Sequence, residues 1–345
     1  MQWKIAVDEE TYHCWKKAEF AGKTLDSYVR DVDGGMVIGL NEAKKCPFLN
    51  EKGLCNLVIS HGDGILSETC DVFPRQIHDF DNRKEYSLVS CCPEVIDILY
   101  KEKKVEFTEY PKDMDEDELF LIRNCMMEVV GNEEYPLNTA FLMAYYILLE
   151  MYEKKEFHMD MNALDELKEG IQKVCVFKKD TFDENNELWL DMVENYRKEG
   201  LYTEYIEEIS QFAEELSKGY EENDIMDALE EFEAELEKYE RLFRNYLVSE
   251  FFTNLLIPDS DLEGMVVMMQ WIAMEYVMMR QALFLKWMQS AKKELAYETV
   301  RDYMVIVSRM TGYDEEDVVE YLENSFQSLI WQWSYMALII GNKEV

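Results

Sequence analysis

The chain has 345 residues, 48% of them hydrophobic, so it is long enough to bury a large core in one to three domains. It contains only 14 glycines and 6 prolines, too few turn residues for a sandwich or barrel of many short strands. The formal net charge is −37, which excludes general binding to nucleic acid or anionic membranes and suits a basic substrate instead. The composition therefore favours a mainly helical protein.

The location of the protein is predicted from its apolar segments. The first residues contain no apolar run of signal-peptide length, so we expect a cytoplasmic protein. The most hydrophobic segment, 265–288, predicts a core helix rather than a membrane span because polar and charged residues interrupt it. These residues are Gln270, Glu275, Arg280, Gln281 and Lys286.

The chain opens on a short apolar stretch, and Asp8 is placed to cap a helix that runs through Tyr12 and Trp15. Segment 31–39 contains the nearest match to a glycine-rich nucleotide-binding loop. No alternation of strand and helix surrounds it, so we interpret it as a turn. A standard dinucleotide-type cofactor domain is therefore not predicted.

Five of the eight cysteines lie between residues 46 and 92, in the pattern C-x8-C-x14-C-x20-C-C. In a cytosolic protein such cysteines are thiols, metal ligands or catalytic groups rather than disulfides. Thiolates from distant positions can form a cage for zinc or an iron–sulfur cluster, and His61 or His78 could join a mixed zinc site. Buried free thiols are the alternative, because cysteine is among the most buried residue types.

From about residue 113 the apolar residues recur at helical spacing. Asp113 precedes an acidic first turn, which is typical of a helix N-terminus. Further helices are predicted at 137–154, 160–174, 186–198, 203–217, 222–250, 261–290, 293–311 and 314–340. We expect a mainly α protein in which an irregular cysteine-rich region, 1–105, is followed by a multi-helix body, 106–345.

Several groups of residues together resemble the flagellin lysine-N-methylase family. In the cysteine-rich region they are Cys46-Pro47-Phe48-Leu49, Gly53-Leu54-Cys55, Cys70 with Phe73-Pro74-Arg75, and Glu85, Ser87-Leu88 and Cys92-Pro93-Glu94. Elsewhere they are Trp3 to Asp8 with Thr11, and Arg244-Asn245-Tyr246-Leu247 with Phe251-Phe252. The resemblance is specific over residues 46–94 and diffuse elsewhere.

The resemblance implies transfer of methyl groups from S-adenosylmethionine to lysines of flagellin. It also implies an iron–sulfur cluster, with zinc as the alternative. The implied metal ligands are Cys46, Cys55, Cys70 and Cys92, with Cys91 as the alternate for the last place.

Arg75 and Glu85 lie within the resembling groups and are candidates for binding the cofactor. Arg75 could pair with a carboxylate of the cofactor, or with Glu85 or Glu94 to brace the cysteine loops. No catalytic residue is identified. The chain departs from the family at Met1 and Gln2, where a cysteine-rich leader is usual, and after Ser308-Arg309-Met310, where an acidic residue and a histidine are usual.

Two functions follow from these observations. The first is a methyltransferase that uses S-adenosylmethionine and acts on flagellin lysines, with a cysteine-bound iron–sulfur or metal centre. The alternative is a non-catalytic helical binding protein descended from the same family, with a metal-stapled or metal-free cysteine segment. Binding of S-adenosylmethionine and metal analysis discriminate between them.

Overall fold

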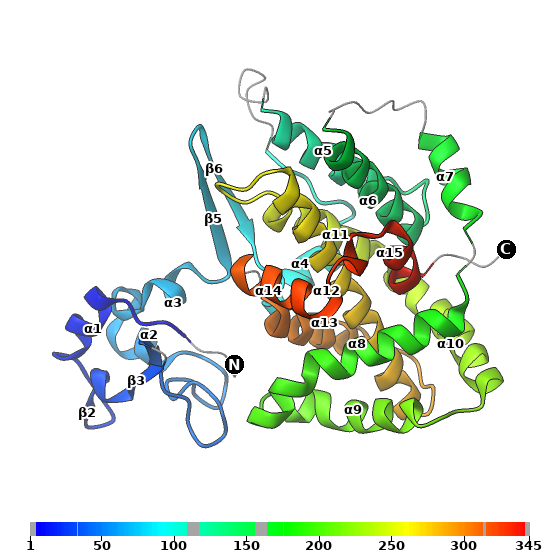
Figure 1. Ribbon diagram of the computed structural model, residues 1–345. Helices are drawn as coiled ribbons and strands as arrows, with labels where there is room; N and C mark the ends of the chain where they lie inside the picture. Colours follow the sequence, from blue (N-terminus) through cyan, green and yellow to red (C-terminus); the bar gives the residue numbers. More distant parts are fainter. Residues whose placement is uncertain are drawn as a thin grey trace.

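The computed structural model describes residues 5–32, 34–108, 117–155, 164–174, 176–312 and 315–341. Small hairpins and short helices come first, and a large helical body follows (Figure 1). The predicted fold class, mainly helical with an irregular N-terminal region, is confirmed. Asp113 lies outside the described residues, and the first long helix is capped instead by Asp117, whose side chain accepts from Leu119 N.

The N-terminal module contains short elements in the order helix, two hairpins, helix, helix. They are α1 (Glu9–Trp15), β1 (Glu19–Phe20), β2 (Lys23–Thr24), β3 (Val29–Val32), β4 (Gly35–Ile38), α2 (Asn56–His61) and α3 (Glu68–Val72). The β3–β4 hairpin is antiparallel, and Gly34 between the strands has a φ of 85°. Because only glycine adopts such a φ without strain, the interpretation of segment 31–39 as a turn is confirmed.

Asp8 caps α1, as predicted from the sequence. Its carboxylate accepts from Thr11 N and from Thr11 Oγ1, both at 2.8 Å. It also accepts from Glu68 N at 3.1 Å. The same side chain therefore stabilises the N-terminus of α1 and connects this helix to α3.

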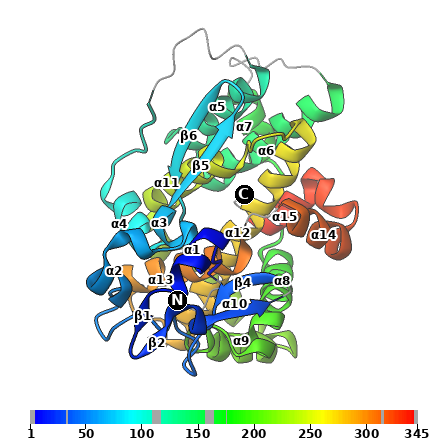
Figure 2. The same ribbon diagram turned by 90° about the vertical axis from the view of Figure 1, so that its left-hand side faces the viewer.

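A longer antiparallel hairpin, β5 (Arg75–Phe80) with β6 (Arg83–Leu88), follows the cis peptide bond Phe73-Pro74. Figure 2 shows it beside the helical body, and β6 contacts helix α11. Helix α4 (Pro93–Lys101) comes next and packs on α11 and α13. The hairpin thus follows the N-terminal module and contacts the helices of the body.

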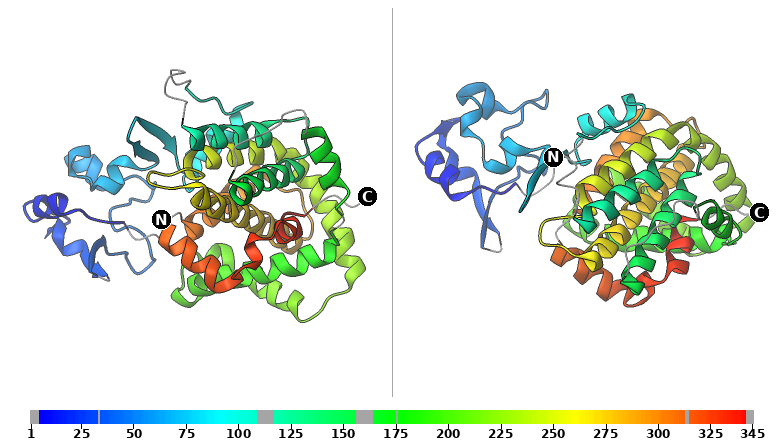
Figure 3. Two further views of the ribbon diagram at one scale, coloured as in Figure 1. Left: turned by 45° about the horizontal axis from the view of Figure 1, so that its top comes forward. Right: turned by 90° about the horizontal axis from the view of Figure 1, so that it is seen from above.

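The helical body wraps around one long central helix, α12 (Leu262–Gln289), nearly all of whose residues are buried (Figure 3). The prediction of a core helix at 265–288 is confirmed, and no helix among the described residues is long and apolar enough to cross a membrane. The helices around it are α5 (Glu118–Gly131), α6 (Leu137–Lys154), α7 (Leu164–Gln172), α8 (Lys178–Glu199), α9 (Thr203–Ser217), α10 (Glu222–Leu236), α11 (Glu240–Asn254), α13 (Tyr297–Thr311), α14 (Glu315–Phe326) and α15 (Trp333–Ile340).

Two long predicted helices are interrupted in the structure. The helix predicted at 222–250 breaks at a 3-10 turn, Glu237–Tyr239, where the Tyr239 hydroxyl donates to Leu295 O at 2.7 Å. The helix predicted at 314–340 divides into α14 and α15, and Gln327 between them has a φ of 52°. In both cases the apolar spacing continues across the break, so periodicity alone does not reveal it.

Buried apolar residues form two separate clusters. One lies in the N-terminal module, around Trp15, Leu25 and Phe48. The other runs through the helical body and already includes Cys92 and Val95. The division of the chain into 1–105 and 106–345 remains a prediction.

Candidate functional site

Three of the four predicted metal ligands lie in the small core of the N-terminal module. Cys46 is buried, Cys55 caps α2, and Cys70 lies in α3. Burial raises the pKa of the Cys46 and Cys70 thiols. Neighbouring thiols raise these pKa values further. Cys70 and Cys55 act on Cys46, and Cys55 acts on Cys70. Cys55 and Cys70, although distant from Cys46 in sequence, therefore lie close enough to Cys46 to raise the pKa of its thiol.

The fourth predicted ligand lies elsewhere. Cys92 is the N-cap residue of α4 and belongs to the core of the helical body. Its neighbour Cys91 is also held by the body, since Arg309 Nε donates to Cys91 O at 3.0 Å. Burial raises the pKa of the Cys91 thiol to about 12. Neither cysteine belongs to the core that contains the other three thiols.

The residues present do not fit a single four-thiolate centre. Within the described ranges, no three His, Cys, Asp or Glu side chains are arranged to hold a metal ion. The two histidines considered as additional ligands have other contacts. His61 Nδ1 lies 2.7 Å from Ser60 Oγ, and His78 Nε2 lies 2.8 Å from Gln76 Nε2 on the hairpin. The cysteine ligand set remains a prediction from the family resemblance.

Arg75 and Glu85, the predicted cofactor-binding pair, are not partners. Arg75 is exposed and donates to Asp71 O at 2.6 Å. Glu85 is buried and accepts from Arg123 Nη1 and Nη2 at 2.6 and 2.7 Å, with Arg83 Nη1 at 3.8 Å. The ion pair that braces this region therefore joins the hairpin to α5, with Arg123 in place of Arg75.

A buried polar cluster lies between β5, α11, α12 and α13, and it includes residues of the family-resembling groups. Ser90 Oγ donates to Glu250, and Asn254 Nδ2 donates to the same carboxylate at 2.6 Å. Burial, with Glu275 and Glu250 close by, raises the pKa of Tyr246 well above its usual range. This cluster is closed to solvent, so it suits support of the fold better than ligand binding.

A cavity with a volume of about 750 Å³ lies on a different side of α12. It is formed by the N-terminus of α6, the first turns of α8, α10 with the start of α11, one face of α12 and the end of α15. Its size is within the usual range of small-molecule sites. We call it the α12 pocket.

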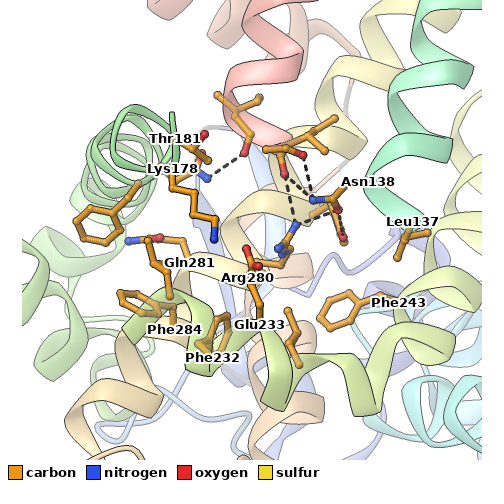
Figure 4. A pocket seen from close by; sticks show the side chains of 18 of the residues that line it. Leu137, Asn138, Lys178, Thr181, Phe232, Glu233, Phe243, Arg280, Gln281 and Phe284 are labelled. Carbon is orange, nitrogen blue, oxygen red and sulfur yellow. Dashed lines mark hydrogen bonds between the residues drawn. The ribbon is translucent and has the colours of Figure 1, made fainter. Parts of the chain in front are cut away.

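One face of α12 provides the floor of the α12 pocket. Tyr276, Arg280 and Phe284 are four residues apart, so they project from the same side of the helix. Phe284 packs edge-on against Phe182 and Phe232, with ring centroids 5.6 and 5.5 Å apart. These phenyl rings, with Phe243 beside Tyr276, make one part of the wall aromatic (Figure 4).

Asn138 holds the polar part of the pocket together. Its Oδ1 accepts from Tyr276 Oη at 2.8 Å and from Arg280 Nη1 at 2.9 Å. Its Nδ2 donates to the carbonyls of Ile340 and Gly341 at 2.9 and 3.1 Å (Figure 4). One amide therefore fixes both the Arg280 guanidinium and the end of α15, as expected of a preorganised binding site.

The charges of the pocket are arranged in two groups. Arg280 contacts only neutral oxygens, Asn138 Oδ1 and Ile340 O, and has no carboxylate within salt-bridge distance among the described residues. Lys178 also lines the pocket, but it pairs with Glu230 at 3.2 Å. On the α10 side, Glu233 and Glu237 are exposed at the wall and have no basic partner within the described ranges. The pocket therefore offers one unneutralised cation opposite carboxylates.

One residue in the sequence is a weak signal for this pocket. Arg280 interrupts the apolar segment 265–288, and a charged residue on an otherwise buried helix needs a polar environment. The remaining lining residues come from four other helices, so only the tertiary structure brings them together.

Comparison with known proteins gives two kinds of match. Residues 123–339 match the family model described as "FliB lysine N-methylase C-terminal domain". A flagellar biosynthetic protein FliU of Salmonella muenchen is 32% identical over 106 residues, which are 27% of this chain and 59% of that protein. A lysine-N-methylase of Salmonella typhimurium is 32% identical over 106 residues, 27% of this chain and 25% of that protein.

These alignments cover less than two thirds of the length of the relatives, and no solved structure matches the chain. The resemblance inferred from the cysteine-rich region is nevertheless confirmed by an independent part of the sequence. Because the family model covers more than half of the chain, including every helix that lines the α12 pocket, this protein belongs to the FliB lysine N-methylase family.

Proposed function

We propose that this protein is a lysine N-methyltransferase that uses S-adenosylmethionine and acts on flagellin. The observation that carries the proposal is the match of residues 123–339 to the C-terminal domain of FliB lysine N-methylases. The names of the relatives support the substrate, since one is a flagellar biosynthetic protein and another a lysine-N-methylase. The net charge of −37 is also consistent with a lysine-bearing substrate, because it attracts basic segments over long range.

Bound S-adenosylmethionine supplies an electrophilic methyl group: the lone pair of a neutral lysine amine forms the new N–C bond, and the pair of the broken S–C bond stays on sulfur. The protein must therefore bind the methyl donor and accept a lysine side chain. The lysine ammonium must lose one proton, to solvent or to a carboxylate. The α12 pocket has the volume for the donor, and Glu237 at its wall can attract the lysine ammonium.

The proposed methyl transfer does not depend on a metal centre. The direct displacement needs only a positioned amine and a bound donor, and side chains at the pocket can hold both. None of the cysteines of the N-terminal module lines the α12 pocket. We therefore assign no step to Cys46, Cys55, Cys70 or Cys92.

The proposal is tested by incubating the whole chain with flagellin and S-adenosylmethionine that carries a labelled methyl group. We expect label on flagellin lysines by mass spectrometry, and inhibition by S-adenosylhomocysteine. A matched flagellin whose surface lysines are replaced by arginine should remain unlabelled. A folded sample that binds flagellin but neither binds the donor nor transfers label would support the alternative of a non-catalytic binding protein.

A further inference from the structure

The α12 pocket combines features that match one kind of small molecule. One part of the pocket is lined by apolar side chains, backed by buried phenyl rings, and this part suits the uncharged ring system of a ligand. An unneutralised guanidinium suits a carboxylate, and the acidic wall suits one or more cations. A ligand that contains a purine, a carboxylate and positive charge satisfies all three at once.

We propose that the α12 pocket is the binding site for S-adenosylmethionine, and that Arg280 binds the carboxylate of its methionyl group. In the same arrangement Glu233 faces the α-ammonium group, and the adenosyl group lies along the apolar part of the pocket wall. This inference rests on the proposed methyltransferase function, but it concerns where the donor binds.

The state of Arg280 is the strongest argument. The chain has 72 acidic and 35 basic residues, so a partly buried arginine would ordinarily find a carboxylate. The hydrogen bonds of Arg280 instead go to neutral oxygens, Asn138 Oδ1 and Ile340 O, both from Nη1. Since an arginine has five donors, the remaining N–H groups are available to a bidentate carboxylate. The charge is thus held in place and left for a ligand.

The surroundings of Arg280 keep it aimed at the cavity. Tyr276 lies one turn away on α12, with the guanidinium 5.5 Å from its ring centroid. Asn138 bonds to both side chains and to the end of α15, so rotation of Arg280 would break several contacts. Preorganisation of this kind lowers the entropic cost of binding.

The acidic wall has a complementary role. Glu233 lies on α10, across the cavity from α12, and Figure 4 shows both it and Arg280 at the pocket. The α-amino acid part of the ligand carries opposite charges on adjacent atoms, which suit an arginine and a glutamate on facing helices. The sulfonium cation is stabilised by the same carboxylates and by neighbouring aromatic faces.

The test compares three ligands that differ in the amino-acid part. S-adenosylmethionine and S-adenosylhomocysteine have the carboxylate and the ammonium, whereas methylthioadenosine has only the nucleoside and the sulfur. Their affinities are measured by calorimetry for the wild-type chain and for Arg280→Gln and Glu233→Gln. The matched controls are Arg301→Gln, on α13 and paired with Asp302, and Glu231→Gln, which pairs with Lys292.

We expect Arg280→Gln to weaken binding of S-adenosylmethionine and S-adenosylhomocysteine by about tenfold or more, because a charged hydrogen bond is lost. Methylthioadenosine should bind as before, and both control variants should bind all three ligands like the wild type. Glu233→Gln should show the same selectivity with a smaller effect. Retained thermal stability of each variant is checked in the same samples.

The proposal is overturned if Arg280→Gln binds S-adenosylhomocysteine as tightly as the wild type. It is also overturned if this folded variant loses methylthioadenosine and S-adenosylhomocysteine equally, because Arg280 would then not recognise the carboxylate. Failure of the pocket and failure of the function are distinguishable. A wild-type chain that methylates flagellin while Arg280→Gln binds normally would refute only the pocket, whereas a wild type that binds none of the ligands would refute the function as well.

Discussion

Glu85 on β6 and Arg123 on α5 form a buried ion pair with two parallel hydrogen bonds, of 2.7 Å from Nη2 and 2.6 Å from Nη1. Both side chains are almost fully buried, with 3% and 2% of their surface exposed. The pair joins the hairpin that follows the cysteine-rich module to the first long helix of the body. The ion pair therefore helps to position the hairpin against the helices.

Removal of one member of this pair should strongly destabilise the chain. Arg123→Leu leaves the Glu85 carboxylate buried without its main partner, and such changes cost about 3–5 kcal/mol. Glu85→Gln should also destabilise, because Arg83 and Arg123 both lose their anion. Urea unfolding at pH 7 measures the effect.

A matched control for this prediction lies on the same hairpin. Lys84 and Asp79 form an exposed ion pair at 2.6 Å, and Lys84→Ala should change the free energy of unfolding by less than about 1 kcal/mol. The double variant Glu85→Gln with Arg123→Leu should cost less than the sum of the single changes. Equal small effects from Arg123→Leu and Lys84→Ala would contradict the structural role of the buried pair.

The cap of α1 should give a pH-dependent contribution to stability. Hydrogen bonds from the backbone of Thr11, and then of Glu68, lower the pKa of Asp8 to about 2. A carboxylate whose pKa is lowered by folding stabilises the native state above its unfolded pKa, about 3.9, and this contribution is lost as the pH falls toward 2.

Asp8→Ala should therefore destabilise α1 at pH 7 by about 1 kcal/mol, the usual value of an N-cap. Hydrogen exchange of residues 9–15, followed by mass spectrometry, measures this local effect. The difference between variant and wild type should shrink between pH 4 and pH 2. An unchanged difference at pH 2 would show that the carboxylate form of Asp8 is not what holds the helix.

The cysteines should differ widely in reactivity. Cys14 is exposed on α1. Burial raises the pKa of Cys91 and Cys125 to about 12, so these thiols stay protonated and unreactive up to about pH 10. Alkylation of the native chain with iodoacetamide, mapped on peptides, should label Cys14 first. Comparable labelling of Cys125 at pH 8 would contradict the buried position.

The sequence was sufficient for much of the fold. The helix at 203–217 and the helix at 137–154 have the predicted bounds, because their apolar stripes and flanking residues are clear. The start of α8 at Lys178 was missed by eight residues, since its first turns are polar and bury little apart from Phe182. Local patterns predict elements well where one face is buried and poorly where it is not.

The site was harder to predict than the fold. The family resemblance predicts Glu85 as a cofactor-binding residue, and this role stays a prediction. Its ion-pair partner Arg123 lies 38 residues away along the chain, outside the resembling groups. The α12 pocket was not predicted because its charges come from helices whose order in space is not encoded in local spacing. In the sequence, only Arg280, a charged residue on a buried helix, indicates the pocket.

The three thiols of the N-terminal module should behave as one chemical group that excludes Cys92. Cys55 and Cys70 lie close enough to Cys46 to raise the pKa of its thiol, whereas Cys92 belongs to the other core. An arsenical that joins two neighbouring thiols, phenylarsine oxide, should therefore bind the native chain with one equivalent at this place. At least two of the variants Cys46→Ser, Cys55→Ser and Cys70→Ser should weaken its binding, since two sulfurs must converge on one arsenic atom. Cys92→Ser should leave the binding unchanged; a loss in this variant would mean that the fourth sulfur reaches the other three, as a four-thiolate centre requires.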